Sequence, residues 1–271
     1  MSPDRSPITL ALITKNEAAN LAACLDSAKP LGCPVVIIDS GSTDGTAAVA
    51  AQYGAAFHIF PDWPGYGAQR NRAHPYIQTD WVLWLDADER LTPELCRSIA
   101  QAVARTDADG KTAFAFNRLT NTFGAFIRHS GWYPDWVVRL YPAAHARYSD
   151  DLLHEKVLLP AGCRTERLQG DCLHYTYTTL EQFLHKQNLY GKIWTQQRSR
   201  EGRRSGLAAA FLHGVGSFVK MYLLKAGFLD GRHGLLLAVL SAQSAFNKYA
   251  ALWLAGENRQ PENPSALEEE H

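Results

Sequence analysis

The chain has 271 residues, of which 46% are hydrophobic and 20% are charged, a composition typical of a globular protein with one or two domains. Its 27 Lys and Arg residues balance 27 Asp and Glu residues, so no overall positive field points to nucleic acid as a partner. The five cysteines contain no C-x-x-C pair, which argues against a zinc ribbon or a disulfide framework and favours a reducing, cytoplasmic compartment.

The first half of the chain alternates strand-like and helix-like segments. Continuous apolar runs predict strands at 8–13, 34–38, 55–60 and 81–85. Helical spacing and capping residues predict helices at 16–28 and 46–53 and a third that begins at Pro93 after the cap Thr92. Strands that are apolar throughout are covered on both faces, and repeated β-α-β units make a sheet largely parallel. We therefore predict an α/β fold with a mostly parallel, doubly wound sheet.

The second half of the chain has a different pattern. Strands are predicted at 113–117, 136–141 and 171–175, joined by long polar loops. From residue 179 the chain is helical and basic, and two apolar segments, 207–228 and 235–254, predict a helical hairpin. The expected organisation is a sheet domain at 1–178, a basic amphipathic helical extension at 179–258 and a flexible tail at 259–271.

The helical extension has two interpretations. His213, Lys220, Lys225 and His233 interrupt its apolar segments, so none reaches the roughly 18 to 20 uninterrupted apolar residues of a spanning helix. The polar N-terminus also lacks the apolar core of a signal peptide. The extension either lies on an anionic membrane surface or packs on the sheet domain with its basic face in solvent.

Two aspartates directly follow the strand at 81–85. Residues i and i+2 of an extended backbone point the same way, so Asp86 and Asp88 can direct two carboxylates to one point. Oxygen ligands of this kind suit Mg²⁺ or Mn²⁺, which take further ligands from water and phosphate. The pattern predicts a divalent metal site beyond the strand end, and an acidic loop before a helix is the alternative.

Polar residues also follow the first two strands, at the edge of the sheet where ligands bind in doubly wound folds. Asp39 ends the second strand and can accept hydrogen bonds from a nucleobase or a ribose, whereas Asp44 is interpreted as a helix cap. Thr14 and Glu17 match the S/T-x-x-E capping box, which gives them a structural alternative. Lys15 and Glu17 nevertheless lie where a nucleotide would bind.

A glycine-rich segment follows the third strand. Gly65-Tyr-Gly67-Ala-Gln69-Arg70-Asn71 lacks the final glycine of a dinucleotide-binding loop and does not follow the first strand, which argues against NAD. Arg70 and Arg72 can still hold a diphosphate.

Four segments in this order resemble glycosyltransferase family 2. They are Ile13-Thr-Lys-Asn-Glu17, Ile37-Ile-Asp-Ser-Gly-Ser-Thr-Asp-Gly45, Gln69-Arg-Asn71 and Leu85-Asp-Ala-Asp-Glu89. The resemblance implies the GT-A fold, an inverting mechanism and a UDP-sugar donor, with Asp88 holding the metal most directly. The residues expected to bind the donor are Thr14, Lys15, Glu17, Asp39, Arg70, Asn71, Asp86 and Arg139, and the candidate metal ligands are Asp88, Asp86 and His154.

Later segments are similar to lipopolysaccharide core β-1,4-glucosyltransferases. These segments are Gly131-Trp-Tyr-Pro-Asp135, Arg139-Leu-Tyr141, His154-Glu-Lys-Val157 and Gly227-Phe-Leu-Asp-Gly231. The resemblance implies transfer of a hexose, glucose from UDP-glucose, to an inner-core heptose of lipopolysaccharide at the inner face of the inner membrane. The alternatives are a polyprenyl phosphate or other cell-envelope glycan acceptor, a sugar-nucleotidyltransferase, and a non-catalytic nucleotide-binding protein.

An inverting displacement also needs a base that takes the proton of the acceptor hydroxyl. Asp135, in the aromatic loop Trp132-Tyr-Pro-Asp-Trp136, and Glu155 are the two candidates, and we prefer Asp135.

Overall fold

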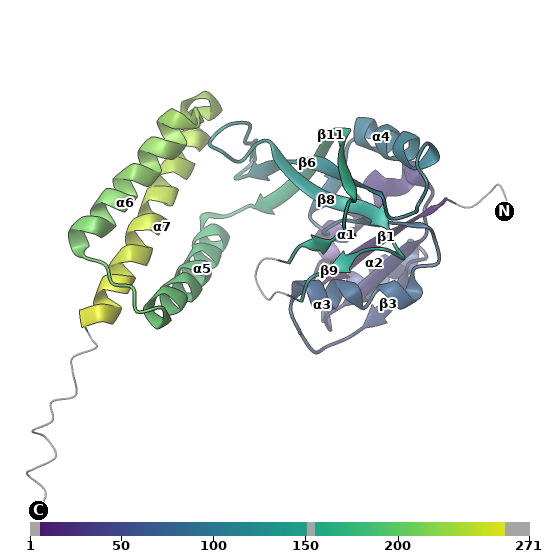
Figure 1. The fold of residues 1–271 in the computed structure, drawn as a ribbon, viewed down its shortest axis with the longest axis horizontal. Helices are drawn as coiled ribbons and strands as arrows, with labels where there is room; N and C mark the ends of the chain where they lie inside the picture. Colours follow the sequence, from purple (N-terminus) through teal and green to yellow (C-terminus); the bar gives the residue numbers. More distant parts are fainter. Residues whose placement is uncertain (1–5, 151–154, 258–271) are drawn as a thin grey trace, which may run out of the picture. The chain divides into compact units, whose positions relative to one another are not determined.

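The computed structural model describes residues 6–150 and 155–257. The described residues form two compact units, one of residues 6–120 with 134–150 and 155–176, and one of residues 121–133 with 177–257. The first unit is built on a β-sheet and the second on helices (Figure 1).

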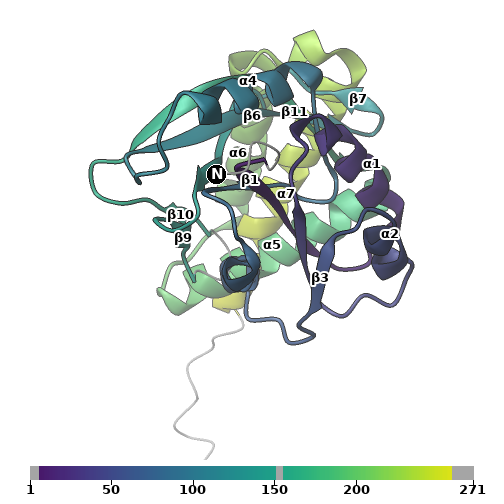
Figure 2. The same cartoon turned by 90° about the vertical axis from the view of Figure 1, so that its right-hand side faces the viewer.

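The first unit begins with four parallel strands that alternate with helices. The strands lie in the order β3-β2-β1-β4, so the strand order reverses beside β1. The strands are β1 (Ile8–Thr14), β2 (Val35–Asp39), β3 (Ala56–Ile59) and β4 (Trp81–Trp84), and the helices are α1 (Ala18–Ala28), α2 (Thr46–Gln52) and α3 (Tyr66–Asn71). Figure 2 shows α1 and α2 beside each other. The α/β class predicted from the sequence is confirmed, and these strands lie within two residues of their predicted bounds.

Beyond β4 the sheet continues with strands of a different kind. The order is β4-β8-β6-β11-β5, in which β8 runs antiparallel to both β4 and β6 and β5 runs antiparallel to β11. The elements are β5 (Glu89–Leu91), α4 (Pro93–Ala104), β6 (Thr112–Thr122), β8 (Asp135–Pro142) and β11 (Arg164–Tyr177). The parallel arrangement therefore covers the first four strands only. No helix connects β6 to β8 in the order of elements, and a crossover of this kind is what makes neighbouring strands parallel.

Short elements complete the chain. They are the 3₁₀ turns Lys29–Leu31, His74–Tyr76 and Gly227–Asp230, the strand β7 (Ala125–Phe126), which pairs with the end of β6, and the two-stranded sheet of β9 (Arg147–Tyr148) and β10 (Val157–Leu158).

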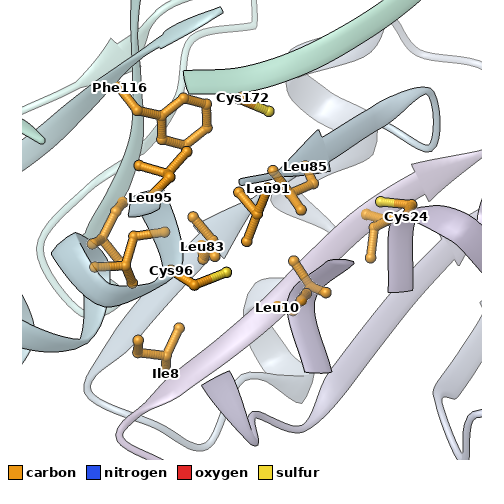
Figure 3. Close-up of a cluster of buried hydrophobic side chains, with 14 of the residues drawn as sticks. Ile8, Leu10, Cys24, Leu83, Leu85, Leu91, Leu95, Cys96, Phe116 and Cys172 are labelled. Atoms are coloured by element: carbon orange, nitrogen blue, oxygen red, sulfur yellow. The ribbon is translucent and has the colours of Figure 1, made fainter. Parts of the chain in front are cut away.

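Strands β1, β2, β4 and β6 are buried on both faces, as expected from their continuous apolar runs, whereas β3 at the edge of the sheet is partly exposed, contrary to that expectation. Leu83 of β4 and the following Leu85 pack with α1 and α4 in one buried cluster, in which Figure 3 shows Cys24 of α1 and Leu95 of α4. Val82 and Trp84 point to the opposite face and belong to a second cluster. Successive residues of one strand thus supply both layers of the core.

A side-chain cap fixes the beginning of α4, and Asp44 bonds to the first turns of α1 and α2. The hydroxyl of Thr92 accepts a hydrogen bond from Leu95 N at 3.3 Å and Pro93 occupies the first turn of α4, as the sequence predicts. The carboxylate of Asp44 accepts from Ala18 N (3.1 Å) at the start of α1 and from Thr46 N (3.0 Å) at the start of α2. Asp44 thus has a structural role at both helix starts, although it is not the N-cap residue of either helix.

The second unit contains the predicted helical hairpin. Its helices are α5 (Leu180–Arg200), α6 (Leu207–Val219), which continues into a π-helical turn (Lys220–Leu224), and α7 (Gly231–Glu257). Helix α6 lies alongside α7, and α5 also packs against α7 (Figure 1). Although the sequence analysis treats the apolar segments as interrupted, 207–224 is long and apolar enough, by length and composition, to cross a membrane, with a mean hydropathy of 1.5.

Candidate functional site

The loop after β2 is organised by Asp39. Its carboxylate accepts hydrogen bonds from Thr14 Oγ1 (2.7 Å), Ser42 Oγ (2.6 Å), Gly41 N (2.8 Å) and Ser42 N (2.7 Å), and the residue is 1% exposed. Because the Thr14 hydroxyl is directed to Asp39, the capping box proposed for Thr14 and Glu17 is wrong, and no side chain caps α1 at Glu17. Asp39 instead ties the ends of β1 and β2 together.

Lys15 and Glu17 lie at the same edge of the sheet. Lys15 Nζ donates to the carbonyl oxygens of residues 40 and 41, at 2.7 and 2.6 Å. Glu17 is partly buried and accepts a hydrogen bond from Asn20 Nδ2 at 3.0 Å. Burial raises the pKa of the Glu17 carboxyl, and the negative charge of Asp88 raises it further. Lys15 and Glu17, which follow β1, thus lie at the same edge of the sheet as Asp39 at the end of β2 and Asp88 after β4.

Asp86 is held between two buried arginines. Arg70 donates to its Oδ1 at 2.7 Å and Arg139 donates to its Oδ2 at 2.8 Å, and these arginines are 3% and 7% exposed. Burial by itself would raise the pKa of the Asp86 carboxyl, but Arg139 and Arg70 hold that pKa well below its usual range. Asp86 is therefore a carboxylate at neutral pH with both of its oxygen atoms engaged.

This cluster continues to both candidate bases. Arg70 Nη1 also contacts Glu155 Oε1 at 2.5 Å, on one side of Asp86. On the other side, Glu89 lies 3.9 Å from Arg139 and 3.6 Å from Arg118, measured between charged atoms. Arg118 also pairs with Asp135 at 2.7 Å. Acidic and basic groups thus alternate from Glu155 through Asp86 to Asp135.

Sequence reasoning missed two members of this network. Glu89 is completely buried, and its Oε2 accepts a hydrogen bond from Asp86 N at 2.9 Å. Glu89 is the last residue of the acidic segment 86–89, so its position in the sequence could have identified it as a member of the site. Arg118 lies on β6 and carries no local signal, because only the pairing of β6 with β8 brings it to Asp135.

Asp88 differs from Asp86 in its surroundings. The segment between them is a turn, in which Glu89 N donates to Asp86 O at 2.9 Å, so the expected extended backbone with both carboxylates pointing the same way is wrong. Asp88 Oδ2 lies 3.4 Å from His174 Nε2, and its side chain is 29% exposed. His174 on β11 is a further residue that the sequence analysis did not identify.

The residues present fit a metal that takes few protein ligands. Among residues 6–150 and 155–257, no group of three or more His, Cys, Asp and Glu side chains is arranged to hold a metal ion. Asp86 has both oxygen atoms bonded to arginines, whereas Asp88 is partly exposed beside His174. Mg²⁺ and Mn²⁺ commonly take one or two carboxylates and complete their shell with water and phosphate, and the partly exposed Asp88 can supply one such carboxylate. The predicted ligand His154 lies outside the described residues.

Asn71 has a structural partner on β9. Its amide nitrogen donates to Tyr148 O and its amide oxygen accepts from Tyr148 N, both at 2.9 Å. One turn earlier, a Cβ added to Gly67 would lie 1.8 Å from Ser149 O and 3.2 Å from Glu155 Cβ. Helix α3 thus closely approaches both Ser149 and Glu155.

Substitution of Gly67 by alanine tests this close approach. We expect Gly67→Ala to lower the free energy of unfolding by about 1–3 kcal/mol, because the backbone of residue 149 must move to admit the methyl group. Chemical denaturation measures this change. Gly45→Ala is the matched control, since the nearest atom to its added Cβ is Ala18 Cβ at an ordinary 3.5 Å. Equal stability of the two variants would contradict the packing described.

Lys15, Asp39 and Asp86 lie at the carboxyl ends of parallel strands, beside the point where the strand order reverses, and Arg70 of α3 and Arg139 of β8 pair with Asp86 there. In α/β proteins this edge of the sheet is where ligands bind. The family model "Glycosyl transferase family 2" matches residues 9–154, more than half of the chain. The chain belongs to glycosyl transferase family 2 and is a glycosyltransferase.

Curated relatives cover almost the whole chain. An "Uncharacterized glycosyltransferase" of Rickettsia felis is 28% identical over 253 residues, which are 90% of this chain and 89% of the relative. The "Lipopolysaccharide core biosynthesis glycosyltransferase LpsC" of Rhizobium meliloti is 26% identical over 261 residues, 90% of this chain and 93% of the relative. Among solved structures, S. aureus TarS 1–349 in complex with UDP-GlcNAc has a TM-score of 0.46 and 13% identity, covering 93% of this chain and 92% of TarS.

Proposed function

We propose that this glycosyltransferase transfers a hexose, glucose from UDP-glucose, to an inner-core heptose of lipopolysaccharide, with inversion at the anomeric carbon. The pairing of Asp86 with Arg70 and Arg139, beside the partly exposed Asp88, is the observation that carries the donor half of the proposal. The likeness to LpsC over 90% of the chain supports the acceptor half. The protein would act in the cytoplasm, at the inner face of the inner membrane.

The donor diphosphate is proposed to bind beside the two arginines. Arg70 and Arg139 are buried, and their bonds to the anionic Asp86 fix them in place. Guanidinium groups held in this way can add charge-assisted hydrogen bonds to a diphosphate beside them. Asn71 supports this site through its bonds to β9. Asp88, positioned by His174, would hold Mg²⁺ or Mn²⁺, and the ion would supply Lewis-acid stabilisation of the leaving diphosphate.

The nucleoside is proposed to lie on the loops after β1 and β2. Glu17 and Lys15 contact it or its ribose, and Thr14 acts through Asp39. The four hydrogen bonds that Asp39 accepts from its own surroundings use all of its acceptor positions. Asp39 therefore contributes by shaping the loop at 40–43 rather than by offering unused oxygen lone pairs.

We propose that Asp135 removes the proton of the acceptor hydroxyl. Its side chain is 40% exposed and is held by Arg118, whereas Glu155 is 20% exposed and shares Arg70 with Asp86. Asp135 is thus the more accessible carboxylate and Glu155 the one more engaged with the donor side of the network.

Substitution of each carboxylate separates the two candidates. We expect Asp135→Asn to lower kcat by about 10²- to 10⁴-fold with little change in KM for the donor, because a general base contributes about that factor. Glu155→Gln is expected to act mainly on donor KM. Initial rates of UDP release measure both. Arg118→Gln is the control that breaks the same ion pair and keeps the carboxylate, and an equal loss of kcat there would remove Asp135 as the base.

The reaction itself is tested with a panel of UDP-sugars and deacylated lipopolysaccharide core as acceptor, with and without Mn²⁺. Acceptor-dependent UDP release with UDP-glucose, and a product heavier by one hexose, is the expected result. Transfer only to a polyprenyl phosphate would show that this lipid, and not the lipopolysaccharide core, is the acceptor. Release of pyrophosphate from a nucleoside triphosphate would indicate a nucleotidyltransferase, and tight UDP binding without turnover would indicate a non-catalytic protein.

A further inference from the structure

Helix α6 presents an apolar face that its own unit leaves exposed. Six large apolar side chains at successive helical spacings, on α6 and the π-helical turn after it, are between 36% and 68% exposed. We call this set the α6 apolar face: Leu207, Phe211, Leu212, Val215, Val219 and Leu223. In a water-soluble protein an apolar helical stripe of this width normally faces the core. Here it does not.

The side of α6 that meets α7 is made of small residues. Ala210 and Gly214 are buried, and a Cβ added to Gly214 would lie 3.2 Å from Ala242 O. Further along, Ser217 and Ser241 share a hydrogen bond of 2.8 Å. Close approach along a seam of small and hydroxyl residues lets α6 pack without using its large apolar side chains. The seam therefore accounts for the packing of α6 against α7. The α6 apolar face has no role in that packing.

Positive charge accompanies this face. From residue 198 to residue 232 there are seven Lys and Arg residues and two acidic residues. Both acidic residues are engaged: Glu201 pairs with Arg198 at 3.1 Å and with Arg203 at 3.4 Å, and Asp230, 4% exposed, accepts hydrogen bonds from the backbone of residues 128 and 129. Arg203 and Arg204 lie four and three residues before the start of α6, and Lys220 and Lys225 lie at its other end. Large exposed apolar side chains with cationic flanks are complementary to an anionic lipid surface.

We propose that α6 lies in the plane of an anionic bilayer, with the α6 apolar face inserted at the boundary between headgroups and acyl chains. This inference rests on the proposed function and deepens it, because it names the surface at which a lipid-borne acceptor is met. Arg203, Arg204, Lys220 and Lys225 then contact lipid phosphate groups.

A spanning arrangement fits the hairpin less well. The 18 residues at 207–224 extend about 27 Å, close to the bilayer core in length. However, His213 stacks on Tyr249 of α7, with ring centroids 3.6 Å apart, so α6 is tied to a helix that carries Gln243, Asn247 and Lys248. Spanning would place those polar groups in hydrocarbon. Binding of a second copy of the chain to the α6 apolar face is also disfavoured. The lysines and arginines that flank this face in each copy would then lie close together and repel one another.

Vesicle binding of the full-length chain tests the inference. Flotation is measured with phosphatidylcholine vesicles that contain 30% phosphatidylglycerol and with phosphatidylcholine alone. We expect the wild type to bind the anionic vesicles at least tenfold more tightly. The double variant Phe211→Glu, Leu212→Glu should lose at least tenfold in that affinity, since two large apolar side chains leave the lipid.

A second double variant controls for the added charge. Gln243→Glu, Asn247→Glu places the same two negative charges on exposed positions of α7, away from the α6 apolar face, and should bind within about threefold of wild type. Equal binding by all three proteins overturns the inference. So does resistance of the membrane-bound protein to carbonate washing, which indicates spanning. Transfer to a deacylated, soluble acceptor should be unchanged in both variants, so failure of the proposed function would be recognised separately.

Discussion

Asp88→Asn is expected to lower kcat for sugar transfer by about 10²- to 10³-fold while the protein stays folded, a loss typical of removing one group that stabilises transition-state charge. Asp88 is the carboxylate at the end of β4 that no arginine of the described residues pairs with, and it is partly exposed beside His174. It is therefore the group best placed to hold a divalent cation against a diphosphate.

Two measurements check this expectation. Initial rates of UDP release give kcat, and electron paramagnetic resonance titration of Mn²⁺ in the presence of UDP gives the metal affinity independently of turnover. Glu94→Gln removes an exposed carboxylate from the first turn of α4 and should keep both quantities within about twofold of wild type. Unchanged Mn²⁺ affinity in Asp88→Asn would show that the metal assignment is wrong.

Asp86→Ala is expected to have the largest effect on stability, a loss of about 3–5 kcal/mol in the free energy of unfolding. The substitution leaves Arg70 and Arg139 buried without the carboxylate that both of them contact. Chemical denaturation at neutral pH measures the loss. Asp62→Ala is the matched control: its ion pair with Arg72 is exposed, so removing it should cost less than about 1 kcal/mol. Similar values for the two variants would contradict the buried cluster.

The same cluster predicts how stability depends on pH. The folded-state pKa of Asp86 lies below its unfolded value of 3.8, so the stability that its ionised form contributes is complete well above pH 3.8. That contribution is lost as the pH falls below 3.8 towards the folded pKa. We expect the free energy of unfolding of the wild type to fall between pH 5 and pH 3 by more than that of Asp86→Ala, in which this group is absent. Parallel curves for the two proteins would exclude the effect.

Much of the first unit follows from local sequence. The apolar runs that become β1, β2 and β4 contain β-branched and large apolar residues that fit a sheet covered on both faces. Thr92 and Pro93 determine the start of α4 through interactions within one turn. Because parallel strands present their carboxyl ends at one edge, the alternation also predicts that Asp39, Asp86 and Asp88 gather there.

The sequence by itself determined the β-α-β order, the helical hairpin and the acidic edge of the sheet, because these depend on periodicity and on neighbours a few residues apart. Only the tertiary structure decided which charges pair. Arg139 reaches Asp86 across 53 positions and Glu155 reaches Arg70 across 85. The first contact depends on the pairing of β8 with β4, and the second on the close approach of α3 to Glu155. A buried charge needs a partner within about 4 Å, and strand register, not local propensity, determines which residue that is.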